Sequence, residues 1–297
     1  MENELKGLCT ITLTPFKDNG SLDEESLRHL TDFYIQQGVH GLTILGIMGE
    51  AHKLTESERL RVMDIVIEQN AGRVPVIVGC SANSTDVAVY LCRKAEEAGA
   101  SAVMIAPPQN LKNESLLLQH FSKIAENISL PIVLQDEPVT TGVILSPDFI
   151  ARLAEAIPSI QYVKLEEAPT TIKITKILER TNKLKIFGGL GGMYFYEEMQ
   201  RGASGIMTGF AFPELLVKTY DLFMSGQQEE ARAYFYNYLP LIRFEAQLGM
   251  GGVAIRKETF KLRNAVSSSH VRFPSVPIDL KTMDELKELI DYLGLKL

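Results

Sequence analysis

The chain has 297 residues, of which 45% are hydrophobic and 23% are charged, and its formal net charge is −7. These values are typical of a globular protein, and an acidic chain without a basic run argues against binding to nucleic acid or to an anionic membrane surface. Three scattered cysteines, an acidic N-terminal segment and the lack of a long apolar stretch argue against a disulfide scaffold, a zinc site, a signal peptide and a membrane span, so we expect a soluble, cytoplasmic protein.

Short apolar runs alternate with amphipathic stretches along most of the chain. Near-continuous apolar runs are typical of parallel strands that helices cover on both faces. In chain order the eight predicted strands are residues 8–13, 42–45, 76–78, 102–106, 132–134, 162–165, 185–187 and 205–208.

The segments between these strands contain residues that favour helix boundaries. Thr55 and Glu58 have the spacing of a capping box, which predicts a helix that reaches about residue 69. Ser146 followed by Pro147 predicts a second helix start.

A helix-to-strand joint recurs at distant points of the chain. Gly38, Gly99 and Gly202 each follow a predicted helix and precede a predicted strand, and glycine tolerates the left-handed conformation that ends many helices. Eight such units predict a (β/α)₈ barrel, the TIM-barrel fold. The alternative is a doubly wound sheet, but residues 14–16 (Thr-Pro-Phe) after the first strand form no glycine-rich phosphate loop.

The strand pattern ends after the eighth strand. Residues 227–246 and 281–293 are predicted helices, and a polar segment punctuated by prolines, residues 267–277, lies between them. We therefore expect a barrel at residues 1–222 and a helical extension packed on it at residues 223–297.

The sixth strand carries the most informative side chain. Catalytic residues of α/β barrels lie at the C-terminal ends of the strands, and strand alternation points Tyr162, Lys164 and Glu166 into the barrel. A lysine that loses hydration there is favoured as the free amine, which can attack a carbonyl. The alternative is a structural ion pair of Lys164 with Glu166 or Glu167.

Three other strand ends offer polar or flexible groups. Gly46 and Gly49 surround a tight turn after the second strand, where backbone N–H groups can hold a carboxylate. Asp136 and Glu137 end the fifth strand, where carboxylates can serve as general acids or bases. The alternative is that they only begin a solvent-exposed loop. The glycines of residues 188–192 allow a ligand to approach the backbone, or form a flexible joint.

Taken together, these motifs resemble the dihydrodipicolinate synthase and N-acetylneuraminate lyase family of class I aldolases, over nearly the whole chain. The matching segments are residues 12–16, Gly46-x-x-Gly49-Glu50, residues 131–134, Pro138-x-x-Thr141-Gly142, Val163-Lys164 and residues 202–209.

The resemblance implies that Lys164 forms a Schiff base with pyruvate or another 2-oxo acid. The iminium cation then serves as the electron sink for lyase or aldolase chemistry, so neither a cofactor nor a metal is expected. It also implies a homotetramer built from tight dimers. The substrate-binding residues that we expect are Gly46, Ile47, Met48, Gly49, Gly189, Leu190 and Met207.

The sequence departs from the family pattern at the proton relay. Gln135 stands where the family has a tyrosine at the end of the fifth strand, and an amide cannot exchange a proton as a phenol does. Glu166, Asp136 or Glu137 would have to take over acid/base work. The catalytic residues that we expect are Lys164, Gln135, Glu166 and Asp136.

The expected pocket is also less polar than the family pattern. Ile47 and Met48 replace hydroxyl residues, Leu190 and Gly191 replace a polar pair, and Thr140 replaces an arginine. We therefore expect a 2-oxo acid with an apolar distal part. Two alternatives remain open, a dehydratase acting on a keto-deoxy sugar acid and a catalytically depleted barrel that binds a small ligand.

Overall fold

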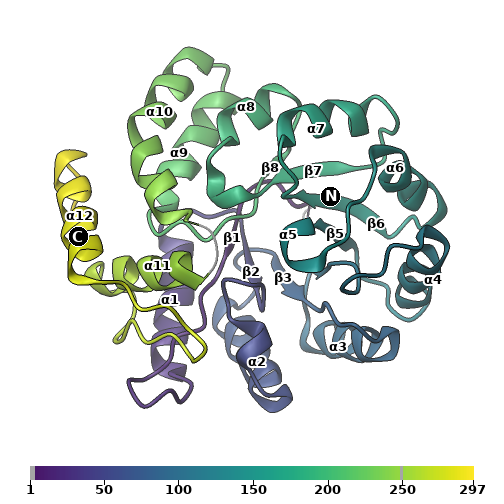
Figure 1. Ribbon diagram of the computed structural model, residues 1–297, viewed down its shortest axis with the longest axis horizontal. Coiled ribbons are helices and arrows are strands. Elements are labelled where there is room, and N and C mark those ends of the chain that lie inside the picture. The colour runs from purple at the N-terminus through teal and green to yellow at the C-terminus, as the bar shows by residue number, and fades with distance from the viewer. Residues whose placement is uncertain (1–3, 248–249) are drawn as a thin grey trace.

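Eight parallel strands close into a barrel in a computed structural model, which describes residues 4–247 and 250–297 (Figure 1). Each strand pairs with the next in the chain, and the last pairs with the first, so the predicted (β/α)₈ barrel is confirmed. The strands are β1 (Gly7–Ile11), β2 (Gly41–Ile44), β3 (Val76–Gly79), β4 (Ala102–Ile105), β5 (Ile132–Asp136), β6 (Ile160–Leu165), β7 (Lys185–Gly188) and β8 (Gly205–Ile206).

Helices surround the barrel and connect its strands (Figure 1). The connecting helices are α1 (Glu24–Gln36), η1 (Ala51–Lys53), α2 (Glu56–Asn70), α3 (Thr85–Ala98), α4 (Glu114–Ala125), α5 (Pro138–Thr141), α6 (Pro147–Ala156), α7 (Thr170–Leu178), η2 (Leu190–Gly192), α8 (Phe195–Gln200) and α9 (Pro213–Met224). Within the described part of the chain, no helix is long and apolar enough to cross a membrane.

The predicted helix boundaries match the structure. Thr55 and Glu58 form a complete capping box at the start of α2, and the Ser146 side chain accepts a hydrogen bond from the Phe149 amide at the start of α6. Gly99 ends α3 with φ of 94°, in the left-handed region where a side chain would be strained.

The C-terminal part adds α10 (Gln228–Glu245), α11 (Met250–Leu262) and α12 (Leu280–Tyr292), of which only the first and last were predicted. Helix α11 was not predicted because it begins Met250-Gly251-Gly252, and glycine is a poor helix former. The Phe260 ring packs on that of Tyr34, with 5.4 Å between ring centroids, and so joins α11 to α1. The division at residue 222 stays a prediction, and α9 runs across that point.

Strand alternation divides the apolar residues into two cores. Tyr162 and Met104 belong to a small cluster inside the barrel, whereas Val163 and Leu165 belong to the larger cluster between strands and helices. The predicted inward face of β6 is therefore correct, and Lys164, between Val163 and Leu165, lies on it and is only 5% exposed.

Candidate active site

Lys164 lies near the C-terminal end of β6, at the mouth of the barrel. Its Nζ is 2.9 Å from Oε2 of Glu166, in the loop directly after the strand. The same carboxylate oxygen accepts a hydrogen bond of 2.9 Å from the Gln135 side-chain amide, and Gln135 pairs with Lys164 in the strand register. Three of the four predicted catalytic residues therefore form one connected group.

Gly189 makes room for the carboxylate of this group. A Cβ atom on Gly189 would lie 2.3 Å from Cγ of Glu166, closer than any real contact. The predicted binding residue Gly189 therefore leaves space for Glu166, and it does not itself line the cavity at Lys164.

Asp136 lies on the other side of β5. Because successive strand residues point to opposite faces, Gln135 faces the barrel interior and Asp136 faces α7. Asp136 Oδ2 is 2.5 Å from Lys173 Nζ, which also pairs with Glu167. Burial raises the pKa of Asp136 to about 6, but the group is away from Lys164, so the structure contradicts the prediction that Asp136 acts on the substrate.

Two adjoining cavities open where the strands end. The first, which we name the Lys164 cavity, has a volume of about 370 Å³ and includes Lys164, Glu166, Leu190 and Met207 in its wall. The second, the Gln135 cavity, has a volume of about 430 Å³ and includes Gln135 and Gly46. The two share the residues Ile47, His52, Glu137 and Thr140.

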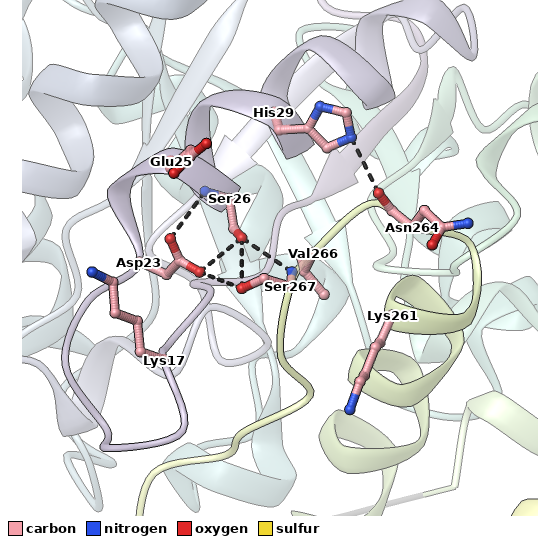
Figure 2. Close-up of a pocket in the computed structure, with 9 residues that line it drawn as sticks. All are labelled: Lys17, Asp23, Glu25, Ser26, His29, Lys261, Asn264, Val266 and Ser267. Atoms are coloured by element: carbon pink, nitrogen blue, oxygen red, sulfur yellow. Dashed lines mark hydrogen bonds between the residues drawn. The ribbon is translucent and has the colours of Figure 1, made fainter.

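A larger hollow of about 660 Å³ lies elsewhere, between the start of α1 and the segment after α11 (Figure 2). There Asp23 caps α1 by accepting from the Ser26 amide at 3.1 Å and also accepts from the Ser267 hydroxyl at 2.6 Å. These bonds hold the C-terminal segment against the barrel. None of the predicted site residues lines this hollow.

The turn after β2 offers backbone donors to a ligand. The amides of Ile47, Met48 and Gly49 have no hydrogen-bond acceptor among residues 4–247 and 250–297, and Ile47 and Met48 line the Lys164 cavity. The Gly49 carbonyl accepts a hydrogen bond of 2.6 Å from Thr14, which fixes the end of the turn. This arrangement suits a carboxylate, which accepts several N–H groups.

Glu198, in α8, lies behind the end of β7 and was not predicted. It is fully buried, its Oε1 accepts a hydrogen bond of 2.6 Å from Thr170, and its Oε2 has no partner among the described residues. Burial raises its pKa to about 7. Sequence patterns give no warning of such a group, because an acidic residue in a short helix normally faces solvent.

Arg256, which was not predicted either, reaches the Lys164 cavity from α11. Its neighbour Lys257 is buried against Glu50, with 2.6 Å between Nζ and Oε1, and burial lowers the pKa of Lys257 to about 8. This pair fixes α11 to the loop after β2. The C-terminal extension therefore contributes directly to the cavity wall.

Comparisons with known proteins agree with this geometry. Residues 4–293 match the family described as "Dihydrodipicolinate synthetase family". The chain is 32% identical to the 4-hydroxy-tetrahydrodipicolinate synthase of Pelobacter propionicus, over 92% of this chain and 93% of that protein. It is 30% identical to the L-2-keto-3-deoxyarabonate dehydratase of Azospirillum brasilense, over 95% and 92%.

Solved structures show the same likeness. The crystal structure of dihydrodipicolinate synthase from Rhodopseudomonas palustris superposes with a TM-score of 0.92, at 37% identity, over 97% of both chains. That of YagE from E. coli K12, in complex with pyruvate, superposes with a TM-score of 0.90, at 25% identity, over 98% of this chain and 99% of that one. The chain belongs to the dihydrodipicolinate synthetase family, and it is a lyase-type enzyme of that family.

Proposed function

We propose that the protein is a Schiff-base-forming lyase of the aldolase type that acts on pyruvate or another 2-oxo acid through Lys164. The observation that carries this proposal is the buried Lys164 amine at the mouth of the barrel, with the Glu166 carboxylate 2.9 Å away. The same cavity is lined by Ile47 and Met48, whose backbone amides have no acceptor among the residues that the structure describes. A nucleophile, an acid/base group and a carboxylate site are thus close together.

The chemistry follows from this arrangement. The Lys164 ammonium gives a proton to Glu166, and the free amine attacks the ketone carbon of the substrate, so that a nitrogen–carbon bond forms while an electron pair moves to the carbonyl oxygen. Glu166 gives that proton to the oxygen, takes a second proton from the nitrogen and passes it to the resulting hydroxyl group, which leaves as water while the nitrogen electron pair forms the carbon–nitrogen double bond. The resulting iminium cation lies beside the Glu166 carboxylate, whose negative charge stabilises it.

The iminium then accepts the electron pair from a breaking bond at the neighbouring carbons, which is the lyase step. We assign Glu166 again to take or give the proton, because Asp136 is on the far side of β5. Glu137 also lines this cavity, but its Oε2 accepts a hydrogen bond of 2.8 Å from the Thr140 amide. We assign Gln135 a positioning role, since its amide donates to Glu166 and cannot itself carry a proton. The substrate carboxylate is assigned to the amides of Ile47 and Met48.

A dehydratase that uses the same iminium is the second candidate. The relative from Azospirillum brasilense, named as a keto-deoxy acid dehydratase, favours it. Leu190 and Gly191 count against it, because they offer no side-chain partner to substrate hydroxyl groups. Product analysis with a keto-deoxy sugar acid distinguishes the two, because a dehydratase releases water and keeps the carbon chain whole.

Reductive trapping tests the shared first step. The wild type is incubated with pyruvate and borohydride, and its intact mass is compared with that of Lys164→Ala. We expect one reduced pyruvyl group on the wild type and none on the variant. Lys185→Ala is the matched control, because Lys185 lies at the opposite end of the neighbouring strand. This variant keeps Lys164 and should form the pyruvyl adduct as the wild type does. A wild type that forms no adduct with any 2-oxo acid would favour the ligand-binding barrel instead.

The homotetramer built from tight dimers is part of the same proposal and rests on the family alone. Light scattering during size-exclusion chromatography measures the assembly directly. A mass of four chains supports it, and a stable monomer would refute it.

A further inference from the structure

Arg256 is a buried cation in the wall of the Lys164 cavity. It is only 5% exposed and extends from α11, far along the chain from the barrel strands. Its Nη1 lies 2.9 Å from the Met48 sulfur, a weak acceptor. Among the described residues, Nε and Nη2 have no hydrogen-bond partner.

The charge of Arg256 is poorly balanced within the protein. Its nearest acidic group is Glu245, with 3.9 Å between Nε and Oε2, which is beyond hydrogen-bond distance. Burial raises the pKa of Glu245 to about 7, so near neutral pH this carboxyl carries only part of a negative charge. A buried guanidinium with two unpaired donors is costly unless an anion reaches it.

The space for such an anion is the Lys164 cavity, whose wall includes Arg256, whereas the backbone at Gly191 packs closely against the guanidinium. Gly191 has φ of 69°, and a Cβ atom there would lie 2.3 Å from Cβ of Ala246 and 3.2 Å from Nη2 of Arg256. A larger residue at position 191 would therefore press on the guanidinium. Leu190 and Met207 add apolar surface to the wall of this cavity, which also contains the charged residues Lys164 and Glu166.

The other cationic side chains of this cavity already have hydrogen-bond partners or an assigned catalytic role. Lys53 donates to Glu50 at 2.9 Å and to the Arg272 carbonyl at 2.7 Å. Lys164 is the proposed nucleophile. The 2-oxo carboxylate is assigned to the turn after β2, which leaves Arg256 for a different anionic group of the substrate.

We propose that Arg256 binds a second carboxylate at the distal end of the substrate, which makes the substrate class a 2-oxo dicarboxylic acid with a short apolar chain between its two ends. This inference rests on the proposed Schiff-base function. It revises the expectation of a simply apolar distal part, because the apolar wall ends at a guanidinium. An arginine fork can bind a carboxylate through two parallel hydrogen bonds.

The test compares two 2-oxo acids of equal chain length. The concentration that gives half-maximal borohydride trapping is measured for 2-oxopentanoate, which ends in a methyl group, and for 2-oxoglutarate, which ends in a carboxylate. We expect the wild type to favour 2-oxoglutarate by about tenfold or more. In Arg256→Met the half-maximal concentration should rise at least about tenfold more for 2-oxoglutarate than for 2-oxopentanoate. Arg256→Lys should keep part of the preference, because it keeps the charge but loses the fork.

Each other outcome has a definite meaning. A wild type that traps both acids equally, or that favours 2-oxopentanoate, overturns the distal carboxylate while leaving the Schiff base intact. If the half-maximal concentration rises equally for both acids in Arg256→Met, the distal carboxylate is also overturned. Arg256 would then bind the 2-oxo carboxylate that both acids share, or would only stabilise the fold. A wild type that traps no 2-oxo acid refutes the proposed function itself. The wild-type comparison remains decisive if Arg256→Met fails to fold.

Discussion

Replacing Glu166 by glutamine isolates the charge next to the nucleophile. The amide keeps the size of the side chain and can still accept a hydrogen bond, but it removes the negative charge that lies 2.9 Å from Lys164 Nζ. Two unit charges at this distance interact by about 6 kcal/mol at an effective dielectric constant of about 20. Loss of about half of that stabilisation in the transition state slows the reaction by roughly a hundredfold.

Single-turnover trapping measures this change. Enzyme and pyruvate are mixed, samples are quenched with borohydride at increasing times, and the trapped fraction is followed by intact mass. We expect Glu166→Gln to reach the adduct roughly a hundred times more slowly than the wild type, because proton transfer and iminium stabilisation both weaken. The adduct should still form, since Lys164 is present.

Glu167→Gln provides the matched control. Glu167 is the next residue, but its carboxylate pairs with Lys173, and it does not line the Lys164 cavity. Lys173 keeps Asp136 as a second partner, so the fold should tolerate the change. If Glu166→Gln forms the adduct at the wild-type rate, Glu166 is not the acid/base group and the mechanism proposed above is wrong.

Three further substitutions test the surroundings of the site. Gly189→Ala would place a Cβ atom 2.3 Å from Glu166 Cγ, so we expect adduct formation to slow about tenfold or more; a wild-type rate would show that the carboxylate need not lie there. Because burial raises the pKa of Glu198 to about 7, the folded protein keeps this proton to higher pH than the unfolded chain, and the wild type should lose up to about 3 kcal/mol of stability between pH 5 and pH 8. Glu198→Gln should flatten that part of the pH dependence in urea unfolding, and an unchanged slope would speak against the raised pKa. Lys257→Met leaves the buried Glu50 with fewer partners and should cost about 3 kcal/mol in the free energy of unfolding; a loss below about 1 kcal/mol would mean that Lys53 and Arg272 suffice.

The barrel could be predicted because each of its units repeats a local pattern. Apolar runs mark the strands, and local helix boundaries such as the Thr55–Glu58 capping box separate them. The inward direction of Lys164 also follows from strand alternation alone. These features depend on neighbours in the sequence, so a single chain reveals them.

The prediction for Asp136 relied on its position at the end of the fifth strand and did not consider which face of the strand its side chain points to. Alternation puts Gln135 and Asp136 on opposite sides of β5, and only the first can reach Lys164. Arg256 was missed for a different reason. Its place in the cavity depends on contact with Met48, 208 positions away in the chain, and on a helix that begins with glycines. No local pattern encodes such a contact.

Peptide mass mapping of the borohydride-reduced pyruvate adduct tests the Schiff-base proposal most directly. We predict a single modified peptide that contains Lys164, formed by the wild type and absent from Lys164→Ala. Modification of Lys257, whose pKa burial lowers to about 8, or of Lys53, which lines the same cavity, in place of Lys164 would contradict the proposal.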